Sequence, residues 1–351
     1  SGWGAKAHVP ALQALSGYEL KAVCTAHEET ARASAEKFGA GLAFHDMNEM
    51  VAHPDVDLIA VVVRVPLHQQ LVTAAIEAKK PVCCEWPLGA DLADAAEMAD
   101  RAKAAGLPTL VGLQAQSDPA VMYARDLVAN GDIGDIVTVN LSVMVGAITE
   151  RGDGRIWQGR RENGANPMTI PGGHSIDALC YILGEFTEVS ARVTTRIEMW
   201  KHAVTGADFP VDAPDTVTAS GVLKSGAEVS YQVASVPYSA SGTCMEIYGC
   251  KGTLVLTSKS VNIGPSQLHL AIGNETMAEI TPQDSYRLIP FDMAAGPGRN
   301  VAQAYARFAT AIQSGQSGTA AAPDFNAAVV RHALIDAMER SHREGKVIKL
   351  G

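Results

Sequence analysis

A histidine and an aspartate stand three residues apart in the stretch Gly173-His174-Ser175-Ile176-Asp177. An imidazole titrates near neutral pH, which suits His174 to donate or accept a proton during a reaction. Asp177 would follow on the same helix face one turn later, where the helix dipole also favours an acid for structural reasons. We predict His174 as a catalytic acid or base and both residues as substrate contacts. The alternative for each is a structural role at the start of a helix.

The chain opens on Gly2-Trp3-Gly4-Ala5, followed by a segment that predicts a helix. Glycines between a strand and a helix let the pyrophosphate of a dinucleotide approach backbone N–H groups at the helix N-terminus. The strand that such a unit needs is missing, so we expect the numbered chain to begin after a few residues of this domain. These four residues are predicted to contact a dinucleotide.

A second contact to the same ligand is predicted after the strand Tyr18–Cys24, at Thr25 and His27. NAD enzymes commonly place an acid at this strand end, where it accepts from the ribose 2′-hydroxyl. Thr25-Ala26-His27 supplies no acid, which tilts the prediction between NAD and NADP slightly toward NADP.

An unusual loop runs from Thr149 to Arg161 and holds four arginines, one tryptophan and three glycines in a protein of formal net charge −10. Guanidinium groups bind anions in a bidentate manner, so the loop is a candidate for recognising a carboxylate, phosphate, sulfonate or polyol. Arg155 and Trp157 are the predicted substrate contacts, with Tyr238 as a weaker one. The alternative is a solvated or subunit-contact loop.

The order of elements predicts two domains, residues 1–117 and 118–351. Short apolar runs alternate with helical segments up to Gln116, which indicates a doubly wound Rossmann sheet. After Ile136 several segments alternate apolar with polar residues, which predicts an open, mostly antiparallel sheet with one covered face. The expected fold class is therefore α/β followed by α+β.

Composition excludes several classes of protein. Hydrophobic residues make up 47% and charged residues 19%, as in a globular protein. The negative charge argues against nucleic-acid binding, and no apolar run is long enough for a membrane helix. Six scattered cysteines, without Cys-x-x-Cys spacing or a signal peptide, lead us to expect reduced thiols in a cytoplasmic protein and no metal site.

Several short motifs, in order along the chain, resemble the Gfo/Idh/MocA family of oxidoreductases. They are the Gly-Trp-Gly turn, Arg64-Val65-Pro66-x-His68, Cys84-Glu85-Trp86-Pro87-Leu88, Gly131-Asp132-Ile133-Gly134 and Gly173-His174-Ser175-Ile176-Asp177. The Glu-Trp pair resembles the subgroup that includes the fungal repressor of galactose genes, because most members have Glu-Lys there.

The resemblance implies further cofactor contacts. It places a strand end over the adenine ribose and pyrophosphate, a Glu-x-Pro turn as cofactor scaffold and an amide against the nicotinamide. Trp86 would pack under the nicotinamide or stack on a sugar-like ring, which makes it a substrate candidate as well. The residues in these positions are Arg64, Val65, Pro66, His68, Glu85, Trp86, Pro87 and Gln114.

Two departures from the family pattern leave the function open. Trp86 replaces the usual lysine, and Ile170 stands where an aspartate is expected four residues before His174. The resemblance implies an NAD(P)-dependent oxidoreductase acting on a sugar, polyol or related hydroxy acid, in a homodimer or homotetramer. The alternatives are a catalytically silent NAD(P)-binding regulator with a protein partner, and a glycoside-cleaving enzyme that uses transient oxidation by NAD.

Overall fold

The computed structural model describes residues 2–259, 264–290, 292–294, 296–315 and 322–351. The chain divides into two compact units: Ser1–Gly112 with Leu288–Val329, and Leu113–Arg287 with Val330–Gly351. Ser1, the first residue of the predicted dinucleotide-binding domain, lies outside the described residues. This division differs from the predicted ranges 1–117 and 118–351 mainly because Leu288–Val329 belongs with the first unit.

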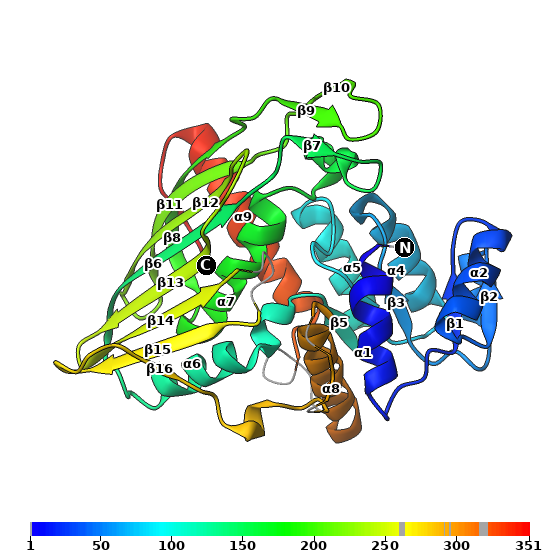
Figure 1. Cartoon of the computed structure of the whole chain (residues 1–351), viewed down its shortest axis with the longest axis horizontal. Helices are drawn as coiled ribbons and strands as arrows, with labels where there is room; N and C mark the ends of the chain where they lie inside the picture. Colours follow the sequence, from blue (N-terminus) through cyan, green and yellow to red (C-terminus); the bar gives the residue numbers. More distant parts are fainter. Residues whose placement is uncertain (1, 260–263, 291, 295, 316–321) are drawn as a thin grey trace. The chain divides into compact units, whose positions relative to one another are not determined.

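The strands of the first unit are all parallel and form two sheets (Figure 1). One sheet pairs β1 with β2, and the other has the order β3-β4-β5. Among the described residues no strand precedes β1, where the sequence lacks the expected first strand. The strands are β1 (Ala22–Cys24), β2 (Leu42–Phe44), β3 (Ile59–Val61), β4 (Val82–Cys84) and β5 (Thr109–Val111).

Helices connect these strands, as the alternating pattern predicts. Asp46 and Asp91 cap two of them by accepting from backbone N–H groups of the first turn. The helices of this unit are α1 (Val9–Ala14), α2 (Glu28–Phe38), α3 (Met47–Ala52), α4 (His68–Glu77), α5 (Leu92–Ala104) and α8 (Gly298–Ser314); α9 (Phe325–Glu344) begins in this unit and continues into the second.

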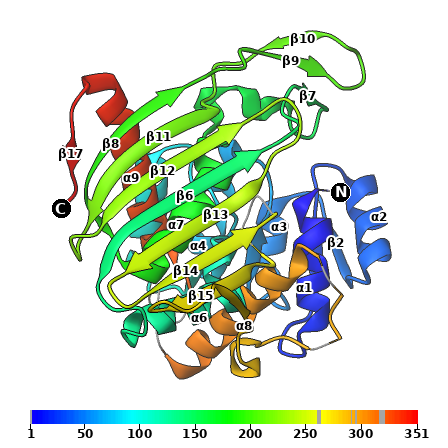
Figure 2. The ribbon, with the colours of Figure 1, turned by 60° about the vertical axis from the view of Figure 1, so that its left-hand side comes forward.

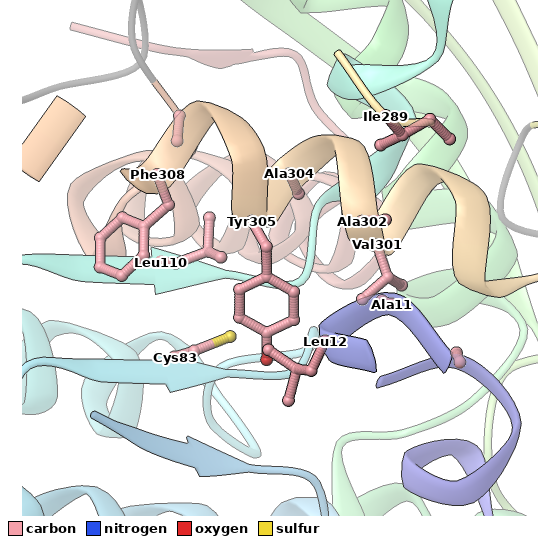
Figure 3. Close-up of a cluster of buried hydrophobic side chains, with 12 residues drawn as sticks. Ala11, Leu12, Cys83, Leu110, Ile289, Val301, Ala302, Ala304, Tyr305 and Phe308 are labelled. Carbon is pink, nitrogen blue, oxygen red and sulfur yellow. The ribbon is translucent and has the colours of Figure 1, made fainter. Parts of the chain in front are cut away.

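A buried apolar cluster joins α1 and α8 to strands β4 and β5 (Figure 3). Tyr305 projects from α8 toward Cys83 of β4, and Leu12 of α1 lies beside its ring. Phe308 packs on the same side of α8 against Leu110 of β5. The cluster explains why α8, although late in the sequence, belongs to the first unit: burying its apolar face supplies most of a helix's stability.

The second unit is built on one nine-stranded sheet in the order β16-β15-β14-β13-β6-β12-β11-β8-β17. All neighbours are antiparallel except β6 and β12, which confirms the predicted open, mostly antiparallel sheet. The strands are β6 (Ile136–Val145), β8 (Phe186–Thr194), β11 (Thr216–Leu223), β12 (Glu228–Ser235), β13 (Gly242–Gly249), β14 (Gly252–Ser258), β15 (Gln267–Ile272), β16 (Ala278–Ile280) and β17 (Ile348–Lys349).

Helices cover one face of this sheet (Figure 2). They are α6 (Pro119–Ala129), α7 (Gly173–Leu183) and the later part of α9. The strands accordingly alternate: in β11, Val217 and Ala219 are buried while Thr218 and Ser220 are exposed. Such alternation is the expected pattern for a sheet that is covered on one side.

A small three-stranded sheet holds the arginine-rich loop in the second unit. Its order is β10-β9-β7, with β7 (Glu150–Arg151), β9 (Met199–His202) and β10 (Asp208–Pro210). The sequence did not predict these short strands. Trp200 and Ile148 form part of its buried cluster. Asp215 fixes the return of the chain to β11 by accepting from the backbone N–H groups of Arg196 at 2.9 Å and Ile197 at 2.7 Å.

Other expectations concern absences. Within the described residues no helix is long and apolar enough to cross a membrane, and no three His, Cys, Asp or Glu side chains gather as a metal site would require. The six cysteines are unpaired, and Cys250 is exposed.

We predict that Asp215→Ala lowers the free energy of unfolding by about 2–4 kcal/mol. The Asp215 side chain is 2% exposed, and its removal leaves the two backbone N–H groups without an acceptor at a buried position. Asp212→Ala is the matched control, since exposed Asp212 accepts one backbone N–H from Arg161 and should cost less than about 1 kcal/mol. Urea titration of both variants measures the difference. Equal losses would contradict this account of the loop.

Candidate active site

The helix that follows the glycine turn contains one wide turn. Val9 donates its backbone N–H to Gly4 O, five residues earlier, across Gly4–His8. Pro10 explains the widening, because it has no N–H to give to the carbonyl four residues before it. A Cβ added at Gly2 would meet no described atom within 4 Å. The backbone at Gly2 is therefore open to close approach of a ligand.

Glu85 at the end of β4 is tied to this helix. His8 Nε2 lies 2.8 Å from Glu85 Oε1, and His8 Nδ1 lies 2.9 Å from Tyr305 Oη. Gly112 leaves room for the carboxylate, since a Cβ there would lie 2.6 Å from Glu85 Oε1. The predicted glycine turn and the predicted Glu85 are thus brought together within the first unit.

His68 turns its imidazole into the protein. Its Nδ1 lies 3.1 Å from both Pro87 O and Leu88 O, and its Nε2 lies 3.3 Å from Val63 O. The shorter contacts favour a proton on Nδ1 that is donated to these carbonyls. Burial lowers the pKa of the imidazole, against the opposing effect of the carbonyl groups. With the proton on Nδ1, His68 fixes the turn after Glu85 to the start of α4.

The other predicted cofactor contacts of this unit differ in exposure. Trp86 is 4% exposed, so its ring shows little surface to solvent. Arg64 and Pro66 are exposed, whereas Val65 is buried. Trp3 packs against the cluster around Tyr305. Pro87 is also buried, and Ala5 is half-buried.

The end of β1 carries a local hydrogen-bond network. Thr25 Oγ1 donates to His27 O at 3.0 Å and lies 2.6 Å from Thr30 Oγ1. The next helix turn begins with Glu28 and Glu29, and Arg32 forms an ion pair with Glu28. These contacts place acidic groups, rather than a free arginine, beside the predicted residues Thr25 and His27.

Gln114 lies three residues past the end of β5 and is 3% exposed. Neither Nε2 nor Oε1 of its carboxamide has a hydrogen-bond partner among the described residues. An unsatisfied buried polar group costs about 1–3 kcal/mol. A group that offers one donor and one acceptor, such as another carboxamide, would satisfy both atoms.

Asp177 is buried in a network of side chains of the second unit. Gln116 donates its amide to both carboxylate oxygens at 3.1 and 3.0 Å, and Arg331 Nε donates to Oδ1 at 3.3 Å. Arg331 also forms a bidentate pair with Glu185. Burial raises the pKa of the Asp177 carboxyl to about 6, although the Arg331 charge opposes the shift. Asp177 thus binds protein groups at both oxygens.

His174 lies in the first turn of α7 and is 1% exposed. A second wide turn, Met168–Gly172, leads into this helix and contains Pro171. Asn166 starts the turn by accepting from the backbone N–H groups of Met168 and Thr169. Gly172 is required by close packing, because a Cβ there would lie 2.7 Å from Tyr231 Oη.

Three of the four arginines in the arginine-rich loop Thr149–Arg161 already contact aromatic rings or a carboxylate of the protein. Arg151 and Arg160 lie over the rings of Trp200 and Phe209, and Arg161 pairs with Glu339 at 2.8 Å. Arg155 is exposed and its side chain makes no hydrogen bond or ion pair with the described residues.

The other two predicted substrate residues of this unit, Trp157 and Tyr238, differ in their contacts and exposure. Trp157 donates its indole N–H to Gly154 O at 2.9 Å. Tyr238 is 84% exposed.

Sequence reasoning missed several residues that hold the candidates in place. Some come from late helices whose sequence shows only an amphipathic pattern, so nothing local marks them. Gln116 could have been suspected from its spacing to Gln114 in Gln-Ala-Gln. The missed residues are His8, Gly112, Gln116, Tyr305 and Arg331.

Comparisons with known proteins place this geometry in a family. The pattern of an oxidoreductase family with an NAD-binding Rossmann fold matches residues 1–113, and that of the Gal80p C-terminal domain matches residues 119–258. Dehydrogenase aclE of Aspergillus oryzae is 32% identical over 271 residues, 74% of each protein. The chain belongs to the Gfo/Idh/MocA family of oxidoreductases. The predicted N-terminal Rossmann fold is thereby confirmed.

Relatives of this Gfo/Idh/MocA protein include both enzymes and regulators. The galactose/lactose metabolism regulatory protein GAL80 of Saccharomyces cerevisiae is 25% identical over 343 residues, 87% of this chain and 74% of that protein. Levoglucosan dehydrogenase in complex with NADH and L-sorbose has a TM-score of 0.86 and 22% identity, covering 100% of this chain and 96% of that one. At this identity the second likeness concerns the fold alone.

Taken separately, one position in each unit fits a contact to a dinucleotide. In the first unit Gly2 leaves its backbone open to a ligand. In the second unit Gln114 holds a buried carboxamide whose two polar atoms have no partner among the described residues. Both observations concern positions that the family pattern assigns to the cofactor. The substrate side departs from the pattern, with Trp86 and Ile170 in place of lysine and aspartate.

We predict that Asp177→Asn changes how stability depends on pH. The folded-state pKa of about 6 lies above the ordinary value of 3.8, so the unmodified protein should lose stability relative to the variant as pH rises from about 4 to 6. The loss is on the order of 3 kcal/mol and levels off above that range. Urea midpoints across this range measure it, and parallel profiles for the two proteins would contradict it.

Proposed function

We propose that the protein is an NAD(P)-dependent oxidoreductase that acts on a sugar, a polyol or a related hydroxy acid. Its membership of the Gfo/Idh/MocA family and its similarity to dehydrogenases support the reaction class. D-Apiose dehydrogenase and levoglucosan dehydrogenase, both named for carbohydrate substrates, support the substrate class.

One observation carries this proposal. Among the described residues, the buried carboxamide of Gln114 has no partner for either polar atom, which a protein built only for stability would avoid. The nicotinamide ring bears a carboxamide that could pair with it as donor and acceptor. The first unit would hold the dinucleotide over Gly2–Ala5 and the ends of β3 and β4. When bound, the nicotinamide supplies hydride transfer.

His174 is the proposed acid or base. Hydride transfer to or from a hydroxyl carbon requires a proton to move at the adjacent oxygen, and imidazole is suited to this at neutral pH. Its burial keeps competing water away from that proton. Asp177 is better placed to support α7 than to touch substrate, since both its oxygens are occupied by Gln116 and one also by Arg331.

The contacts after β1 favour NAD(H) over NADP(H), against the slight lean from the sequence. Glu28 and Glu29 would lie beside a 2′-phosphate and repel it, and Arg32 is already paired with Glu28. Thr25 remains available to a ribose hydroxyl. Homo-oligomeric assembly, an anionic substrate held by Arg155 and Trp157, and a cytoplasmic location stay predictions.

A second candidate is a regulator that binds the dinucleotide without turning it over. The match to the Gal80p C-terminal domain and the similarity to GAL80 favour it. So does the replacement of the family's lysine and aspartate by Trp86 and Ile170. Tight NADH binding without absorbance change across a panel of sugars and polyols would support this candidate.

We predict that His174→Asn lowers kcat by about 10²–10⁴-fold on whichever panel member the unmodified protein oxidises, because the proton transfer loses its partner. The Kd for NADH should stay within about twofold of the unmodified value. Nicotinamide absorbance measures turnover, and cofactor fluorescence measures binding. Full activity in the variant would remove His174 from the mechanism.

We predict that the protein binds NADH at least about tenfold more tightly than NADPH. Glu28→Ala should narrow this ratio, because it removes a negative charge and releases Arg32 toward the 2′-phosphate. Glu36→Ala is the matched control: it lies two turns later on α2, is exposed, and should leave the ratio unchanged. Equal binding of the two cofactors by the unmodified protein would contradict the prediction.

A further inference from the structure

The first unit contains a buried row of polar side chains for which family and sequence supplied no role. His8 is 4% exposed and Tyr305 is fully buried. The two nitrogens of His8 are held at 2.8 Å by Glu85 Oε1 and at 2.9 Å by Tyr305 Oη. The imidazole therefore links the end of β4 to α8 and has no ring nitrogen left for a ligand.

The direction of each hydrogen bond follows from the chemistry of the groups. An ionised carboxylate only accepts, so His8 donates from Nε2 to Glu85. In the neutral imidazole Nδ1 is then an acceptor, and the Tyr305 hydroxyl donates to it. This order gives each group one defined orientation. The Cys83 side chain lies in the same buried cluster as the Tyr305 ring (Figure 3).

Glu85 is constrained from the opposite side as well. A Cβ at Gly112 would lie 2.6 Å from its Oε1 and 2.9 Å from its Cδ, so only glycine leaves the carboxylate in place. The second oxygen, Oε2, makes no hydrogen bond with the described residues, and it is not among the polar atoms sealed from solvent. The side chain keeps 13% exposure. One oxygen is thus fixed inward and the other is presented outward.

We infer that His8 and Tyr305 are positioning residues that fix the Glu85 carboxylate, so that its outer oxygen accepts a hydrogen bond from a ribose hydroxyl of the dinucleotide. The inference rests on the proposed function. The ribose hydroxyls are neutral donors that suit a carboxylate, whereas the pyrophosphate would be repelled by it. A carboxylate held in one rotamer also loses less entropy on binding than a free one. Neither His8 nor Tyr305 touches the ligand in this scheme.

The arrangement makes cofactor affinity depend on α8. Tyr305 reaches His8 from Leu288–Val329, the segment that returns to the first unit. Its ring is enclosed by Leu12 and Cys83 (Figure 3), so the hydroxyl has little freedom to leave Nδ1. Loss of that hydroxyl would free the imidazole to rotate away from Glu85 without emptying the apolar cluster.

The test measures the Kd for NADH by cofactor fluorescence on the whole chain. The temperature is kept well below the lowest thermal unfolding midpoint among the variants. The variants are His8→Leu, His8→Gln, Glu85→Gln, the double variant His8→Leu/Glu85→Gln, and Tyr305→Phe. Tyr18→Phe is the matched control, because its hydroxyl lies in the same cluster and donates to the Tyr305 backbone carbonyl at 2.8 Å without touching His8 or Glu85.

We expect His8→Leu and Glu85→Gln each to raise the Kd about tenfold, and the double variant to exceed Glu85→Gln by no more than about twofold. Tyr305→Phe should raise the Kd about threefold. His8→Gln should recover part of the affinity, since its amide can still donate to Glu85. Tyr18→Phe should lower the unfolding midpoint but leave the Kd within about twofold.

A Kd for His8→Leu within about twofold of the unmodified protein would overturn the inference while leaving the proposed function intact. If the fold-increases in Kd of His8→Leu and Glu85→Gln multiplied in the double variant, the inference would also be overturned, because His8 would then act independently of Glu85. If Tyr18→Phe raised the Kd as much as Tyr305→Phe, the effect would come from general loss of stability in the cluster, and the inference would be overturned. If the unmodified chain binds neither NADH nor NADPH, the proposed function fails and the inference with it.

Discussion

A buried carboxylate must accept hydrogen bonds from the protein, because burial removes its hydration. Both units of this protein depend on that constraint. In the first unit, His8 meets Glu85. In the second, Gln116 and Arg331 meet Asp177. In each case the carboxylate follows or precedes a residue assigned to the ligand, and its partners come from remote parts of the chain. The polar networks therefore set the local geometry at the places where chemistry is expected, while the apolar clusters supply the stability.

The sequence predicted the elements well where periodicity is strong. Continuous apolar runs identified the parallel strands, and alternation after Ile136 identified the large antiparallel sheet, as in β11. The two- to four-residue strands β7, β9, β10, β16 and β17 were missed, because they show neither a continuous apolar run nor a sustained alternation.

The candidate site was predictable only in part. Strand ends and glycines were recognised, but their partners were not. His8 and Tyr305 are 297 residues apart, and no local pattern in α8 predicts that a tyrosine hydroxyl there contacts an imidazole. Burial was also not predictable from the sequence: Trp86, predicted to pack under the nicotinamide or to stack on a sugar-like ring, is 4% exposed. Pairing over long distances and side-chain burial are tertiary properties, which composition and spacing do not determine.

The enzyme and the regulator candidates make the same use of the first unit's predicted cofactor residues. Glu85 and His68 keep their contacts within that unit whichever candidate is correct. On the substrate side only His174 remains of the family's ionisable set. A lineage can therefore retain the nucleotide fold while its substrate residues change, since fold and chemistry are separable.

The return of Leu288–Val329 to the first unit bears on how the protein is made. Ribosomes release a chain from its N-terminus, and domains usually fold in that order. Here α8 is synthesised only after Leu113–Arg287, the larger part of the second unit. Until that segment has been made, α1 lacks the helix that covers its apolar face. A unit built from one continuous segment would not leave this face uncovered for so long.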